Sequence, residues 1–122
     1  MGAFVLESLQ VYALAEQLAD AVWNITITWE PFAKSTVGHQ LVRAADSVGA
    51  NIAEGYGRAS PADNQRFVRT ARGSLYEVRH FLRRADKRNL LKREQKPAIH
   101  RILRELLPRL NAYLRSLGKI DS

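Results

Sequence analysis

Residues 34–55 read KSTVGHQLVRAADSVGANIAEG, a segment with the periodicity of an amphipathic helix. Gly55 and Gly57 stand at its end, where a residue in the left-handed conformation often terminates a helix. We therefore predict a helix over residues 34–54, capped by these glycines. Its apolar side chains recur every three or four residues and share one face: Val37, Leu41, Ala44, Ala45, Val48 and Ile52.

A similar stripe precedes this helix. It predicts a helix over residues 9–28, with an apolar face made by Val11, Leu14, Leu18, Val22 and Ile25. The β-branched residues 26–28 and the nearby Pro31 favour an end to that helix. Residues 29–34 are therefore predicted to form a loop.

A third stripe begins after the glycines. Ser60, Pro61 and Asp63 supply an N-cap, a proline at the first helical position and an acid in the first turn. These signals predict a helix over residues 61–88, and residues 89–91 then predict a turn. The apolar face of this helix is expected to contain Phe67, Ala71, Leu75, Val78, Leu82 and Ala85.

The last stripe runs from Ile99 to Leu117 and predicts a helix over residues 93–117 that Gly118 closes. Pro108 lies inside it and cannot donate a backbone hydrogen bond to the Arg104 carbonyl, so we expect a kink there. Four amphipathic helices joined by short loops predict an all-α fold. The expected architecture is one domain, residues 1–122, folded as an up-and-down four-helix bundle.

The composition is that of a globular domain, with 46% hydrophobic and 25% charged residues. No apolar stretch reaches the roughly 18 residues that a membrane helix needs, and the first residues lack a signal-peptide pattern. We therefore expect a cytoplasmic protein without membrane association. The chain has no cysteine, which excludes disulfides, zinc–thiolate sites and thiol nucleophiles.

The net charge of +7 is unevenly distributed. Residues 1–57 carry two basic and six acidic side chains, a net charge of −4, whereas residues 58–122 carry seventeen and six, a net charge of +11. On the last two predicted helices, the basic side chains oppose the apolar stripes. We expect them to bind the RNA or DNA backbone, although a charged outer face is ordinary for any surface helix: Arg66, Arg69, Arg72, Arg79, Arg83, Lys87, Arg101 and Arg104.

The helix over residues 34–54 has a second organised face. Five polar residues at spacings of 3, 4, 4 and 3 positions form a polar ridge along this face: Gln40, Arg43, Ser47, Asn51 and Glu54. Such a ridge either fixes the register of neighbouring helices, which we favour, or binds a second subunit, a partner or a ligand. Gly73 and Ser74 are small enough to serve the same contact.

An apolar strip of Tyr12, Ala19 and Trp23 lies beside the main stripe of the first helix. It is either an interface or the edge of a wide core face.

Catalytic and metal-binding patterns are weak. Glu77 and His80 match the Glu-x-x-His element of di-iron bundles, but two such elements and two more glutamates are needed. No Gly-x-Ser-x-Gly elbow or Walker motif is present. We expect no enzyme activity, no catalytic residues, no metal, no cofactor and no small-molecule substrate.

Three blocks of the sequence resemble one known family. Residues 39–58 (HQLVRAADSVGANIAEGYGR), residues 71–77 (ARGSLYE) and residues 9–12 (LQVY) resemble the bacterial four-helix bundle proteins also called 23S rRNA intervening-sequence or S23 proteins. Gly49 stands where that family often has proline. The matched positions are the site residues that the resemblance implies: Gln40, Arg43, Ser47, Asn51, Glu54, Gly55, Arg58, Gly73, Ser74 and Glu77.

The resemblance implies an up-and-down four-helix bundle that assembles as a homopentamer. Some family members are encoded inside insertions in rRNA genes, which favours the nucleic-acid hypothesis without defining a role. Two functions therefore stay open. The chain is either a basic oligomeric module that binds RNA or DNA, or a protein-interaction scaffold that uses the polar ridge.

Overall fold

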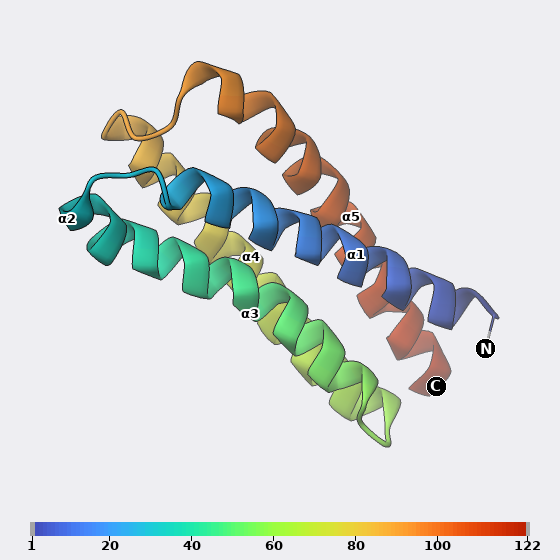
Figure 1. Ribbon diagram of the computed structural model, residues 1–122. Coiled ribbons are helices and arrows are strands. Elements are labelled where there is room, and N and C mark those ends of the chain that lie inside the picture. Colours follow the sequence, from blue (N-terminus) through green and yellow to red (C-terminus); the bar gives the residue numbers. More distant parts are fainter. Residues whose placement is uncertain (1, 122) are drawn as a thin grey trace.

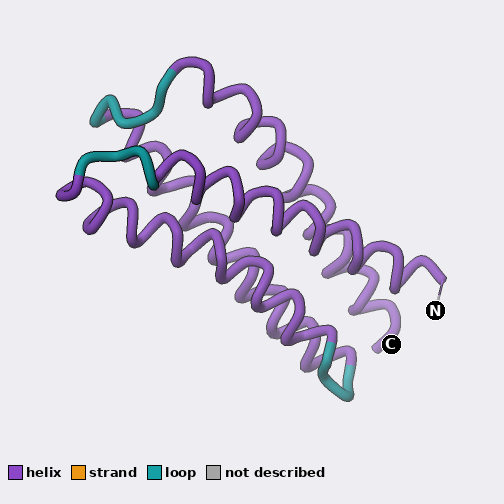
Figure 2. The backbone as a smooth tube through the Cα atoms, viewed as in Figure 1, coloured by secondary structure: helices purple, strands orange, loops and turns teal. Residues whose placement is uncertain are grey.

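The structure is a computed structural model that describes the backbone of residues 2–121 and the side chains of residue 8 and residues 10–118. Within these residues every regular element is helical, so the predicted all-α fold is confirmed (Figures 1 and 2). The elements are α1 (Gly2–Thr26), α2 (Pro31–Ala33), the π-helical η1 (Lys34–Gly38), α3 (His39–Tyr56), α4 (Pro61–Lys87), the 3-10 helix η2 (Arg93–Gln95) and α5 (Lys96–Asp121).

The four long helices α1, α3, α4 and α5 form an up-and-down bundle, as predicted. Helix α1 packs against α3 and α5, and α4 packs against the same two helices, so each long helix has two neighbours. Figure 1 shows successive helices running in opposite directions, with the N- and C-termini at the same end of the bundle. Surfaces formed between α3 and α4, or between α4 and α5, therefore run along the whole length of the molecule.

One continuous core joins the four helices. Leu18, Leu41, Leu75 and Leu106 come from four different helices, and none of them exposes any side-chain area. Complete burial of a leucine stabilises a fold by about 1.5–3 kcal/mol. The predicted stripes therefore supply the core, with one exception on α4 that is described below.

The corner between α1 and α3 differs from the prediction. Helix α1 ends at Thr26, and residues 31–33 are helical instead of forming a loop. The Glu30 carboxylate accepts hydrogen bonds from the backbone N–H groups of Phe32 (3.1 Å) and Ala33 (2.7 Å), and Pro31 occupies the first helical position. The first helix does end before Pro31, as predicted, but Glu30 and Pro31 also start a new helical segment inside the predicted loop.

The glycines after α3 also behave differently. The helix continues to Tyr56, and Gly57 has φ −77°, so the predicted left-handed cap is wrong. Gly55 lies inside the helix and is buried against α4. A Cβ atom there would lie 2.5 Å from Asn64 Oδ1 and 2.9 Å from Phe67 Cβ. Helices α3 and α4 approach so closely here that only a residue without a Cβ atom fits.

Helix α4 starts as predicted, because Ser60 Oγ accepts a hydrogen bond from the Asp63 N–H (3.1 Å) and Pro61 follows it. The core position assigned to Phe67 is wrong. Phe67 is half-buried at the edge, and Val68 is buried in its place. The predicted turn after α4 is confirmed, with Asn89 at φ 60°.

Helix α5 contains Pro108 and continues past Gly118 to Asp121, so Gly118 does not close it. The kink at Pro108 stays a prediction. Among the described residues, no helix is long and apolar enough to cross a membrane.

Candidate nucleic-acid interface

The exposed side of α4 and α5 carries most of the predicted phosphate-binding cations. Six of them are exposed, and none pairs with a carboxylate among the described side chains. The six are Arg69, Arg79, Arg83, Lys87, Arg101 and Arg104. Because none of the six forms an ion pair within the described residues, they are available to an external anion.

The other two predicted cations are engaged within the protein. Arg66 donates to Asp63 Oδ1 at 2.8 and 3.1 Å. Arg72 is half-buried, and its Nη1 donates to Asn111 Oδ1 (3.1 Å), which joins α4 to α5. These two arginines therefore differ from the six exposed cations, because each is hydrogen-bonded to another side chain of the protein.

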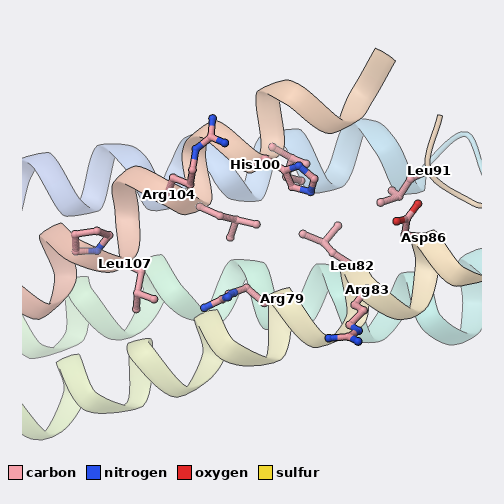
Figure 3. A pocket seen from close by; sticks show the side chains of 11 residues that line it. Arg79, Leu82, Arg83, Asp86, Leu91, His100, Arg104 and Leu107 are labelled. Atoms are coloured by element: carbon pink, nitrogen blue, oxygen red, sulfur yellow. The ribbon is translucent and has the colours of Figure 1, made fainter. Parts of the chain in front are cut away.

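A groove of about 600 Å³ runs between α4 and α5 (Figure 3). Arg79 and Arg83 border it on α4, and His100 and Arg104 border it on α5. Its remaining lining is largely apolar and includes Leu82, Leu91, Ile99, Leu103 and Leu107.

Asp86 is the one acid among the described residues that line this groove, and Lys96 Nζ lies 2.7 Å from its Oδ1. The hydrogen bond from Lys96 lowers the pKa of Asp86 below its ordinary value, and the positive charges of Lys96, His100 and Lys87 act in the same direction. The groove as a whole is therefore positive.

A second groove, of about 590 Å³, lies between α3 and α4. None of the described residues that line it is acidic. Its basic side chains come from both helices: His39, Arg43, His80, Arg84 and Arg88. The sequence patterns did not predict this cluster, because each helix contributes only part of it and helical periodicity does not show which helices pack together.

The middle of the predicted ridge forms an internal contact. Ser47 Oγ lies 2.9 Å from Ser74 Oγ, and Asn51 Nδ2 donates to both the carbonyl (2.8 Å) and the hydroxyl (3.0 Å) of Ser47. Ser74 is buried and the other two are half-buried. These three residues therefore hold α3 against α4.

The two ends of the ridge differ from its middle. Gln40 and Arg43 are exposed and line the second groove. At the other end Arg58 pairs with Glu54 and lies 3.8 Å from Asp63, which ties the loop between α3 and α4 to both helices. Both Arg58 and Arg66 lie over the ring of Phe67, at 4.6 and 4.5 Å from its centroid.

The remaining motif positions on α4 face solvent. Gly73 and Glu77 are exposed, and a Cβ atom at Gly73 would have no described heavy atom within 4 Å. His80 is exposed as well, and no cluster of three or more metal-binding side chains occurs among the described residues.

Tyr76 was not singled out by the sequence patterns as a binding residue. Its side chain is 50% exposed on α4. Arg72 precedes it by four residues, and Arg79 and Arg83 follow it by three and seven, so the four share one side of the helix. The sequence signal that could have identified Tyr76 is its spacing of three, four and seven residues from arginines on one predicted helix.

The apolar strip on α1 is largely a surface feature. Tyr12 is 37% exposed, Trp23 is 55% exposed and Ala19 is half-buried. Ile27 extends the strip with 46% exposure. Ala19 packs at the edge of the core, whereas Trp23 is a surface side chain, and the interface stays a prediction.

The family model described as 23S rRNA-intervening sequence protein matches residues 7–112. The chain belongs to the 23S rRNA-intervening sequence protein family. A similar fold occurs in a protein of unknown function from the S23 ribosomal protein family of Bacteroides thetaiotaomicron. The two structures superpose with a TM-score of 0.78 and 21% identity, over 89% of this chain and 98% of the other. None of the curated proteins compared with the chain matches it.

Two of the three sequence blocks that resembled this intervening-sequence family meet in the structure. Residues 39–58 form α3 and the start of the following loop, and residues 71–77 lie on the facing part of α4. Their shared contact is the hydrogen-bonded group of Ser47, Asn51 and Ser74. In this member of the family, the motif therefore serves first to join two helices.

Proposed function

We propose that this 23S rRNA-intervening sequence protein is a non-enzymatic, homo-oligomeric bundle that binds the backbone of RNA or DNA. The binding surface is the exposed basic side of α4 and α5, and the protein would meet such a partner in the cytoplasm. The observation that carries the proposal is the set of six exposed cations, none of which pairs with a described carboxylate.

The physical reason is that neighbouring unpaired arginines repel one another, and a polyanion relieves this repulsion. Phosphates supply the charge, and each neutralised phosphate releases condensed counterions. Exposed arginines on a helix face contact the backbone without reading base edges. The expected binding is therefore sensitive to salt and tolerant of sequence.

The family resemblance supports a homopentamer. Five copies would carry a charge of +35, which strengthens the field that attracts a polyanion. The exposed strip of Tyr12, Trp23 and Ile27 offers apolar area for contacts between subunits. Because this strip is on α1 and the residue that follows it, such contacts would leave the outer sides of α4 and α5 free.

The alternative function, a scaffold that presents the polar ridge to another protein, has less support. Ser47 and Asn51 at the centre of the ridge are hydrogen-bonded inside the bundle, with Ser74 on α4. Only Gln40 and Arg43 remain as exposed ridge residues outside the ion pair of Glu54 with Arg58.

Native mass spectrometry with and without added RNA tests the proposal. We expect one oligomeric species that gains the mass of bound RNA at low ionic strength. An Arg79→Gln, Arg83→Gln double variant is expected to keep the oligomer and lose most of the bound RNA. A Lys34→Gln, Arg43→Gln variant removes the same charge from exposed positions on η1 and α3 and should retain RNA. An oligomer that gains no RNA or DNA at any protein concentration tested would refute the binding function.

A further inference from the structure

The groove between α4 and α5 has two chemically distinct parts. Its floor contains leucine side chains from both sides, including Leu82 of α4 and Leu103 and Leu107 of α5. Both α5 leucines are only half-buried, so the bundle leaves part of this apolar surface uncovered. The volume of about 600 Å³ lies within the range of pockets that hold small organic molecules.

The rims of the groove are cationic on both sides. Arg79 and Arg83 are one helical turn apart on α4, as are His100 and Arg104 on α5 (Figure 3). The carboxylate of Asp86 is engaged by Lys96. A ligand in this groove therefore meets apolar surface at its centre and positive charge along both edges.

We propose that this groove binds a single-stranded segment of nucleic acid, with phosphates on the arginine rims and one or two bases on the leucine floor. The inference rests on the proposed backbone-binding function and specifies the form of the strand. The combination of charges and apolar floor matches an unpaired nucleotide, which carries an anionic backbone and a base with apolar faces.

The leucine floor is the feature that favours a single strand over a duplex. In a duplex the bases are paired and stacked, so only phosphates, sugars and base edges reach the protein surface. The exposed arginines alone would bind such a backbone, and a hollow with a leucine floor would add nothing. An unpaired base can leave the stack and bury its face against apolar side chains.

The test compares three fluorescently labelled probes of equal length, titrated into the wild-type oligomer at low salt. They are a single-stranded oligouridylate, the same sequence in a duplex, and an abasic strand that keeps the phosphates and lacks the bases. We expect the single strand to bind at least about tenfold more tightly than the abasic strand.

The Leu103→Gln variant tests the floor without a change of charge. It should lose most of the preference for the strand with bases. Leu90→Gln is the matched control, because Leu90 is also half-buried but does not line the groove. If Leu103→Gln does not fold, 2-aminopurine placed in the single strand reports on wild-type protein directly, since its emission is expected to change when the base becomes buried.

The outcomes separate the inference from the function on which it rests. Equal affinity for the single and abasic strands, with unchanged 2-aminopurine emission, would overturn the inference and leave backbone binding intact. Tighter binding of the duplex than of the single strand would do the same. Absence of binding to all three probes would remove both proposals.

Discussion

The hydroxyl oxygens of Ser47 on α3 and Ser74 on α4 lie 2.9 Å apart. This contact lies in the segments whose sequence resembles the family, and Asn51 completes it by donating to the Ser47 hydroxyl at 3.0 Å. It fixes α3 against α4, so that the basic side chains of both helices gather in one groove.

Replacing Ser74 with alanine tests the energetic role of this contact. The variant leaves the half-buried Ser47 hydroxyl without its partner across the interface, so the free energy of unfolding should fall by about 1 kcal/mol. Urea denaturation measures the change. Ser35→Ala is the control, since that hydroxyl is exposed and donates locally, to the Phe32 carbonyl three residues earlier. Equal stability of both variants would show that the contact contributes nothing.

Two glycines should respond to alanine in opposite directions. Gly55→Ala places a Cβ atom 2.5 Å from Asn64 Oδ1, so overpacking is expected to lower the free energy of unfolding by about 1–3 kcal/mol. Gly73→Ala meets open space and should raise it by roughly 0.5–1 kcal/mol, because alanine favours a helix interior. Thermal denaturation of the two variants measures both changes in stability. A stabilised Gly55→Ala protein would contradict the close packing of α3 against α4 at this position.

The ion pair of Asp86 with Lys96 predicts a pH dependence. The pKa of Asp86 in the folded protein is lowered, chiefly by the hydrogen bond from Lys96. Its contribution to stability is therefore present above the unfolded-state pKa and is lost as the pH falls through the folded-state value. The melting temperatures of wild type and Asp86→Asn should differ at pH 7 and converge by about pH 2. The control Glu94→Gln, at an exposed acid that forms no ion pair among the described side chains, should match the melting temperature of wild type at pH 7. A difference between wild type and Asp86→Asn that persisted at low pH would argue against the pair.

Tyr76 is expected to stack on an unpaired base beside Arg79. Tyr76→Ala should weaken single-stranded RNA binding about tenfold, whereas Tyr76→Phe should keep it, because stacking needs the ring and not the hydroxyl. Fluorescence anisotropy measures both affinities. Phe32→Ala removes an exposed aromatic ring from α2 and serves as the control. Equal losses of RNA affinity in all three variants would show that the effect does not come from base stacking.

Much of the fold could be predicted from local signals. The Ser60-Pro61 start of α4 and the turn at Asn89 follow from backbone chemistry that acts within a few residues. Phe67 was misplaced because a position at the edge of a helical face is core or surface depending on its neighbours. Here Arg58 and Arg66 lie over its ring at the surface.

The candidate site was predictable only in part. The charge excess and its helical faces were visible in the sequence, but the partners of Arg66 and Arg72 were not. Arg66 pairs with Asp63, three residues earlier on α4, and Arg72 donates to Asn111, which lies 39 residues away. The grooves likewise require knowledge of which helices are adjacent.

The salt dependence of RNA affinity tests the central claim most directly. For wild-type protein and a single-stranded RNA, the logarithm of the association constant should fall linearly with the logarithm of salt concentration, with a slope of about −0.7 for each neutralised phosphate. The Arg79→Gln, Arg83→Gln variant should show a shallower slope, and the Lys34→Gln, Arg43→Gln control on η1 and α3 should match wild type. A slope near zero in wild type, or the same loss in both variants, would contradict a binding surface on the basic side of α4 and α5.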